Sequence, residues 1–200
     1  DYVYHEHLSY HSIRSLLPFL NNQGLSIIDI RRIPTKGGSI RVLCQKLASI
    51  SNSPLVEKYI EDEIKAGCYS FDAYKDLFCK IQDMNNSINT LLNDYSTLPI
   101  YCYGAAPSSV VNASLLSYDN KLAAYIDDNH LRHNLLSPNV SIPVYPPDHL
   151  SDADECVVII GAWRFADLII PKVKQIQPHA VIIVPDLTNG LKVIDQSCGN

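Results

Sequence analysis

The sequence lacks the features of a membrane or secreted protein. No apolar run in its 200 residues comes close to the roughly 20 residues that a membrane-spanning helix needs, and no charged-then-apolar leader opens the chain. It has no CxxC pair and no dense cysteine framework; its six cysteines are dispersed, several of them in apolar runs such as VLCQ and CVVII. We therefore expect reduced, mostly buried cysteines, no membrane partner and a cytoplasmic location.

Clustered basic charge is missing as well. The chain has 16 Lys and Arg against 21 Asp and Glu, a formal net charge of -5, and its basic residues are scattered. Because phosphate neutralisation needs clustered Lys and Arg, this composition argues against nucleic acid as a partner. What the chain does have is 46% hydrophobic residues, enough to bury a full core as one large domain or two small ones.

The chain begins at Asp1 and its only methionine is Met84, so we expect it to be a piece of something longer. Its opening stretch, YHEHLSY, packs two histidines, a glutamate and two tyrosines into seven residues. A histidine near its ordinary pKa can accept a proton from a carbon acid, and a neighbouring glutamate can fix its tautomer. The stretch is therefore either part of a catalytic site or a solvated cluster at a domain edge.

A metal site is a second interpretation of the same stretch. His5, His7 and His11 form HxHxxxH, and imidazole is a common zinc ligand. The pattern lacks the HExxH spacing of helical zinc sites, and no CxxC completes it. We therefore assign no metal ligand, and a metal-dependent hydrolase stays open only as the less favoured alternative.

Apolar periodicity predicts the secondary structure. It indicates a helix over residues 12–22 that Gly24 ends, two neighbouring strands at 25–32 and 39–46, and helices that run from Pro54 to Gly67 and from Phe71 to about Tyr95. From Leu98 the short β-rich runs LPIYCYG, KLAAYIDD, CVVIIGA and AVIIVPDL alternate with polar or helical sequence. This alternation predicts an α/β fold with a mainly parallel sheet.

Ligands of such sheets bind at the carboxyl ends of the strands, which here lead into YGAAPSS (103–109), IDDN (126–129) and GAWRF (161–165). YGAAPSS opens a helix, so its backbone N–H groups could face a phosphate, although an ordinary strand-to-helix turn explains it equally well. Asp127 and Asp128 could accept hydrogen bonds from a ribose or be solvated loop acids. Trp163 and Phe165 could form a pocket wall, or the tryptophan could belong to the core or an interface.

The stretches YHEHLSYHS, PTKGGSIRV, YCYGAAPSS, YIDDN and GAWRF together resemble the C-terminal domain of the SAM-dependent sugar C-methyltransferases, which methylate nucleotide-linked keto-deoxysugars. The resemblance covers nearly the whole chain. It implies the end of the methyltransferase core, with the catalytic segment and a β-hairpin, over 1–50. It also implies a helical connector over 51–97 and a Rossmann-like substrate-binding domain, with its sheet flanked by helices, over 98–200.

The resemblance also implies site residues. Tyr4, Glu6 and His7 would be catalytic, with His7 removing the proton next to the ketone, Glu6 supporting it and Tyr4 hydrogen-bonding the enolate oxygen. Substrate binding is implied for two loops and two further positions: Lys36, Gly37, Gly38, Ser39, Tyr103, Gly104, Ala105, Ala106, Ser108, Asp127 and Trp163. The chain departs from the family pattern at Lys36, where a histidine is frequent, and at Pro107, Ser108 and Ser109, where the family often has a lysine and a glycine.

The cofactor of this family is S-adenosyl-L-methionine (SAM). Because this chain carries no glycine-rich SAM loop, SAM would be bound by a domain outside it. The resemblance places zinc in the N-terminal domain of the family, which is also outside this chain. The expected partner is a nucleotide-sugar or another activated ketone. A module of the same fold that binds nucleotide or another protein without catalysis remains the alternative from a different functional class.

Overall fold

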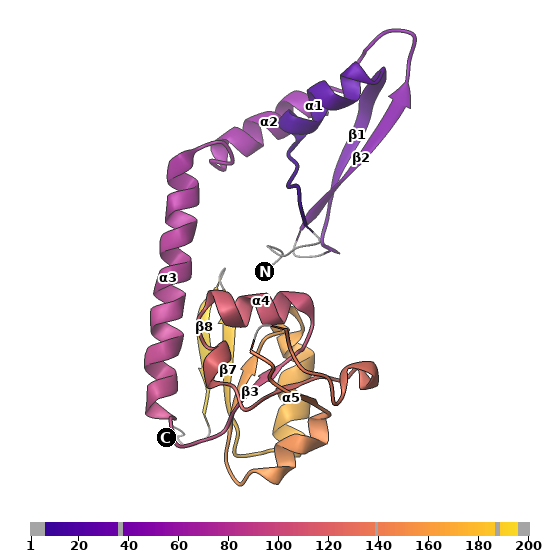
Figure 1. The fold of residues 1–200 in the computed structure, drawn as a ribbon. Coiled ribbons are helices and arrows are strands. Elements are labelled where there is room, and N and C mark those ends of the chain that lie inside the picture. The colour runs from indigo at the N-terminus through magenta and orange to yellow at the C-terminus, as the bar shows by residue number, and fades with distance from the viewer. Residues whose placement is uncertain (1–6, 36–37, 139, 187–188, 196–200) are drawn as a thin grey trace. The chain divides into compact units, whose positions relative to one another are not determined.

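The chain folds as two compact units, and each is described by itself. The computed structural model describes residues 7–35, 38–138, 140–186 and 189–195. The hairpin unit is Leu8–Leu77, and the sheet unit contains the residues from Phe78 onward. The boundary lies inside α3 (Phe71–Asp94), a helix of 24 residues (Figure 1).

The hairpin unit is built from α1 (Ile13–Asn22), β1 (Leu25–Ile33), β2 (Ser39–Lys46) and α2 (Leu55–Lys65). A capping box starts α1: the Ser12 side chain accepts from the Ser15 N–H, and the Ser15 side chain accepts from the Ser12 N–H. The two strands pair antiparallel. The small core of the unit contains Ile13, Ile27, Ile30 and Val56, so both helices pack on one face of the hairpin.

The sheet unit has six strands in the order β5-β4-β3-β6-β7-β8. All neighbours are parallel except β7 and β8, which form an antiparallel pair. The strands are β3 (Ile100–Tyr103), β4 (Ala124–Ile126), β5 (Val144–Tyr145), β6 (Val157–Ile160), β7 (Val181–Asp186) and β8 (Gly190–Ile194). The central strands are buried throughout because helices cover both faces.

The helices of the sheet unit are α4 (Pro107–Leu115) and α5 (Ala166–Ile176), with short 3-10 helices at Asp119–Lys121, His130–Arg132, Pro147–Asp152 and Trp163–Phe165. Side chains of β3 alternate between two clusters: Cys102 packs with residues of α3 and α4, and Tyr103 packs with residues of α5. Figure 1 shows α5 and α4 around this sheet. The predicted α/β fold, a mainly parallel Rossmann-like sheet flanked by helices and preceded by a helix, a hairpin and a helical connector, is confirmed.

The expectation of mostly buried cysteines is only partly correct. All five described cysteines are free; Cys102 and Cys156 are buried and Cys44 is half-buried, but Cys68 and Cys79 are exposed. The prediction was wrong for these two because Cys68 lies in the turn after α2 and Cys79 on the solvent side of α3. Cys198 lies outside the described residues.

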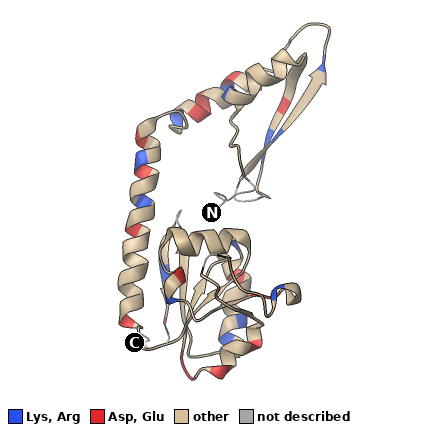
Figure 2. Ribbon diagram, viewed as in Figure 1, with Lys and Arg blue, Asp and Glu red and all other residues tan. Residues whose placement is uncertain are grey.

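Charges on the described surface are mixed. Figure 2 shows acidic and basic residues interspersed along α2 and α3. None of the described helices combines the length and the apolar character needed to cross a membrane.

Candidate functional site

Three loops meet at the carboxyl edge of the sheet. The chain moves from β3 to β4 and β5 in one direction and then returns to place β6 on the other side of β3. The connections that leave β3 and β6 therefore run in opposite directions along the sheet. Open α/β sheets bind their ligands at such a switch point, beside the carboxyl ends of the strands. The three predicted turns, at 103–109, 126–129 and 161–165, all lie at this edge.

Gly104 allows the loops after β3 and β6 to pack closely. Its φ is +108°, and a Cβ at this position would lie 2.8 Å from the Cβ of Ala162. The N–H of Ala162 donates to the carbonyl oxygen of Tyr103 at 3.0 Å, which fixes the approach. Only glycine combines this backbone conformation with this contact.

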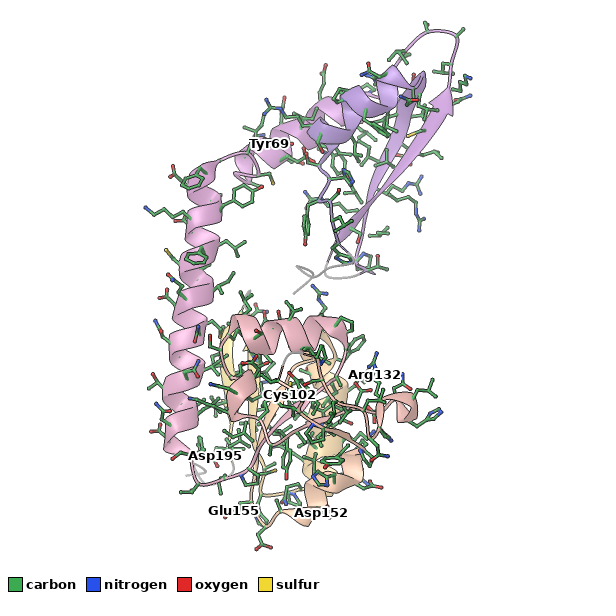
Figure 3. The ribbon with its side chains drawn as sticks, viewed as in Figure 1. Tyr69, Cys102, Arg132, Asp152, Glu155 and Asp195 are labelled. Carbon is green, nitrogen blue, oxygen red and sulfur yellow. The ribbon has the colours of Figure 1, made fainter. Side chains whose placement is uncertain are left out.

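Asp127, directly after β4, is buried and holds this edge together. Its Oδ2 accepts from the N–H of Ala105 at 2.7 Å and from Nη1 of Arg132 at 2.8 Å. Its Oδ1 accepts from the N–H of Asn129 at 2.9 Å. The side chain of Asp127 is 8% exposed, so a buried carboxylate is compensated by three hydrogen bonds and one positive charge. Arg132 is marked in Figure 3.

Asp128, the next residue, is placed differently. Its side chain is 55% exposed and pairs with the ammonium group of Lys172 on α5. The hydroxyl of Tyr103 lies 3.1 Å from both carboxylate oxygens. Burial and the negative charge of Asp128 raise the pKa of Tyr103 well above its ordinary value, so this phenol is a stable hydrogen-bond donor.

A pocket of about 480 Å³ opens between these carboxylates and α5. One side is polar, with Asp127, Asp128, Arg132 and Lys172, and the other is apolar, with Ala162, Phe165, Leu168 and Ile169; Tyr103, Gly104 and Ala106 complete the lining. Such a volume, with an apolar wall and a few fixed polar groups, is typical of small-molecule sites. The arrangement can bind a ligand that has a flat apolar part and hydroxyl groups.

A second pocket, of about 390 Å³, lies in the hairpin unit. It brings the segment before α1 next to the loop before β2; its lining is His11, Ser12, Arg32, Gly38, Ser39, Ile40, Tyr59, Glu63 and Cys68. Glu63 is positioned by α1, because its carboxylate accepts from the N–H groups of Ile13 at 2.6 Å and Arg14 at 3.2 Å. The remaining polar groups of this pocket can contact a polar ligand.

The family of C-methyltransferase C-terminal domains matches residues 34–185. The chain belongs to this family. Its resemblance to the C-terminal domain of C-methyltransferases is thereby confirmed. This C-methyltransferase domain is 24% identical to the C-methyltransferase NovU of Streptomyces niveus over 180 residues, which are 88% of the chain and 43% of NovU. The chain thus spans less than half of the length of that relative.

Among solved structures, UDP-D-quinovosamine 4-dehydrogenase from Vibrio fischeri is similar to part of the C-methyltransferase domain. It is 18% identical, with a TM-score of 0.36, over 50% of this chain and 95% of that chain.

The structure places the residues predicted for this C-methyltransferase domain in different surroundings. Four of them, Tyr103, Gly104, Ala106 and Asp127, line the pocket of the sheet unit, and Gly38 and Ser39 line the pocket of the hairpin unit. Tyr4, Glu6, Lys36 and Gly37 lie outside the described residues. His7 is half-buried in the segment before α1.

Three predicted residues are not in the pocket lining of the sheet unit. Trp163 lines a different cavity, with Arg164 stacked over its ring at 5.0 Å. Ala105 contributes a backbone N–H to Asp127, and Ser108 is half-buried in the first turn of α4. Phe165, and not Trp163, forms the aromatic wall of the pocket.

Sequence reasoning missed Arg132 and Lys172, and it named Asp128 as a possible hydrogen-bond acceptor without including it among the residues that the resemblance implies. Arg132 could have been found from its closeness to Asp127 in the chain. Lys172 follows Asp128 by 44 residues, so no local signal connects them. Among the described residues, no group of three or more His, Cys, Asp or Glu side chains is placed to hold a metal, and His5 lies outside them.

Proposed function

We propose that this chain is the C-terminal, substrate-binding part of a SAM-dependent C-methyltransferase that acts next to the ketone of a nucleotide-linked keto-deoxysugar or a related ketone. Membership in the family and the pocket at the carboxyl edge of the sheet support this proposal together. The observation that carries it is the pocket itself, which gathers Tyr103, Gly104, Ala106 and Asp127, all of them named from the sequence as substrate-binding residues.

The pocket of the sheet unit would bind the activating group of the substrate. Its walls supply apolar surface from α5 and carboxylates from the end of β4, while Gly104 lets the loops after β3 and β6 pack closely beside it. Binding energy from this remote group would orient the ketone for reaction, because interactions far from the reacting atoms can be used to position them.

The chemical step would use the opening segment of the chain. His7 would remove the proton next to the ketone, Glu6 would support the base, and Tyr4 would donate a hydrogen bond to the oxygen as the enolate forms. A proton next to a carbonyl becomes removable only when the developing oxyanion is stabilised, which a placed donor and a tuned base provide.

The described part of this chain does not fit SAM. Its strand-to-helix turn has a single glycine, Gly104, whose free side is filled by Ala162, so it forms no glycine-rich cradle. We therefore assign the methyl donor to a part of the protein outside this chain and derive no step from it here.

The test is methyl transfer by the longer protein that contains this chain, with SAM and nucleotide-linked 4-keto and 3-keto sugars as substrates. Loss of a general base costs on the order of 100-fold or more, so His7→Ala should reduce the rate by at least that factor. His179→Ala, at an exposed histidine of the sheet unit, is the matched control and should keep the wild-type rate. Wild-type turnover by His7→Ala would exclude His7 as the base.

A further inference from the structure

The apolar stripe of α3 is buried along only half of the helix. Met84, Ile88 and Leu92 lie four residues apart on one face and belong to the core of the sheet unit. In steps of three or four residues back from Ile81, four further large apolar residues follow: Phe78, Leu77, Tyr74 and Phe71. These four, here called the exposed stripe, are between 49% and 81% exposed, and no core cluster of the described residues includes them. A contiguous apolar surface of this kind indicates a binding partner.

The exposed stripe is already held in one arrangement. Its backbone is part of a helix of 24 residues, and the hydroxyl of Tyr74 donates to the carbonyl oxygen of Cys68 at 2.9 Å. Phe71, Tyr74 and Phe78 follow the spacing i, i+3, i+7 that helices use when they lay an apolar face into a groove. Aromatic rings have few rotatable bonds, so covering these rings costs little side-chain entropy.

The size of the exposed stripe indicates what kind of partner covers it. A fully buried aromatic side chain removes about 150–250 Å² from water, so its three partly covered rings can bury roughly 400 Å² more, or about 800 Å² counted over both partners. Contacts between domains of one chain bury about 600–1,500 Å², whereas stable complexes of separate proteins need about 1,200–2,000 Å². A tethered partner manages with the smaller area because its effective concentration is high. The exposed stripe therefore fits another part of the same protein better than a second copy.

Such a further part exists in NovU, because the matched region is only 43% of that relative. We infer that the exposed stripe of α3 is the surface on which the SAM-binding part of the same protein docks. Methyl transfer requires the reacting atoms to be held about 3–3.5 Å apart, so the part that binds the methyl donor must be fixed against the part that binds the ketone. This inference rests on the proposed function and names the surface through which the two parts are joined.

The test is thiol labelling of a Tyr74→Cys variant, in the 200-residue chain and in the longer protein that contains it. Cys79 is the internal control, because it is exposed and lies about 140° round the helix from position 74. Mass spectrometry of digests gives the labelling rate at each position. The new thiol should react at least about 10-fold more slowly in the longer protein than in the 200-residue chain, while Cys79 should react at similar rates in both.

A matched pair of neighbouring substitutions tests whether the apolar face causes this protection. Added to Tyr74→Cys in the longer protein, Phe78→Asp should restore fast labelling, because a buried carboxylate without a partner opposes docking. Cys79→Asp adds the same charge at the next position, behind the stripe, and should leave the protection in place. Unfolding curves of both variants would verify that they are folded.

A photocrosslinking side chain introduced at Leu77 identifies what covers the stripe. Crosslinks in the longer protein should join position 77 to peptides of its SAM-binding part. Three results would overturn the inference: equal labelling rates in the two proteins, slow labelling already in the 200-residue chain, or crosslinks to a second copy or to a different part. None of these measurements depends on turnover, so their failure is distinguishable from failure of the proposed function, which methyl transfer tests.

Discussion

The carboxylate of Asp127 accepts a hydrogen bond of 2.7 Å from the backbone N–H of Ala105, and this bond ties the end of β4 to the turn after the neighbouring strand β3. The two residues are 22 positions apart. The bond fixes the turn that borders the pocket to the end of β4, and it engages one N–H that would otherwise be available to a ligand.

Replacing this clamp should destabilise the sheet unit. Asp127→Asn removes the charge that compensates Arg132 and weakens three hydrogen bonds, so we expect the free energy of unfolding to fall by about 2 kcal/mol. Urea denaturation followed by circular dichroism measures it. Asp128→Asn is the matched control; its ion pair is half exposed and its loss should cost less than about 1 kcal/mol. Equal losses in both variants would contradict the different roles assigned to the two carboxylates.

A methyl group at Gly104 should be costly for two reasons. Gly104→Ala combines a φ of +108° with a contact of 2.8 Å to Ala162, and we expect a loss of about 3 kcal/mol in unfolding free energy. Gly190→Ala has a similar φ of +91° but nothing within 4 Å, so strain alone should cost about 1 kcal/mol. Chemical denaturation of the two variants separates strain from contact; if they lose the same amount, the close packing against Ala162 has no energetic role.

In the hairpin unit, Glu63 should stabilise the start of α1. It accepts hydrogen bonds from the N–H groups of Ile13 and Arg14, and the hydroxyl of Tyr69, marked in Figure 3, also donates to it. Loss of such a cap costs about 1 kcal/mol, so Glu63→Ala should speed amide hydrogen exchange at Ile13 and Arg14 roughly fivefold. Glu61→Ala, on the same helix, removes only an exposed ion pair of 3.8 Å with Lys65 and should leave these rates unchanged.

High pH should destabilise the protein through its buried thiols. Burial raises the pKa of Cys156 from 9.0 to about 11 and that of Cys102 to about 12. The unfolded chain then releases its thiol protons at lower pH than the folded one, so this stabilisation is complete below pH 9 and is lost as pH rises through 11.

Denaturation curves between pH 8 and 10.5 measure this dependence. Cys156→Ala should flatten the decline in unfolding free energy by up to about 1.4 kcal/mol per pH unit, which is the slope that one proton contributes. Cys79→Ala, which removes an exposed thiol, should show the same dependence of unfolding free energy on pH as the wild type. A slope that is identical in all three proteins would show that ionisation of Cys156 is not linked to unfolding.

Much of the architecture was predictable because it depends on local pattern. The apolar spacing after Ser12, the helix from Phe71 and the short β-rich runs from Leu98 were sufficient to predict the elements and a mainly parallel sheet. The order of five short motifs was sufficient to indicate the family. The turn at Tyr103–Gly104 and the acid at Asp127 were found for the same reason: residues that follow strands of a parallel sheet meet at one edge.

What the sequence by itself determined is thus the order of the elements, the family and the edge of the sheet where a pocket forms. Tertiary structure alone decided that Asp127 is a buried clamp while Asp128 is half exposed in the pocket lining, that Lys172 pairs with Asp128 from α5, and that Phe165 rather than Trp163 forms the pocket wall. The physical reason is that burial and charge pairing depend on which distant segments pack together. Neighbours in sequence carry the same local signal but can have opposite environments.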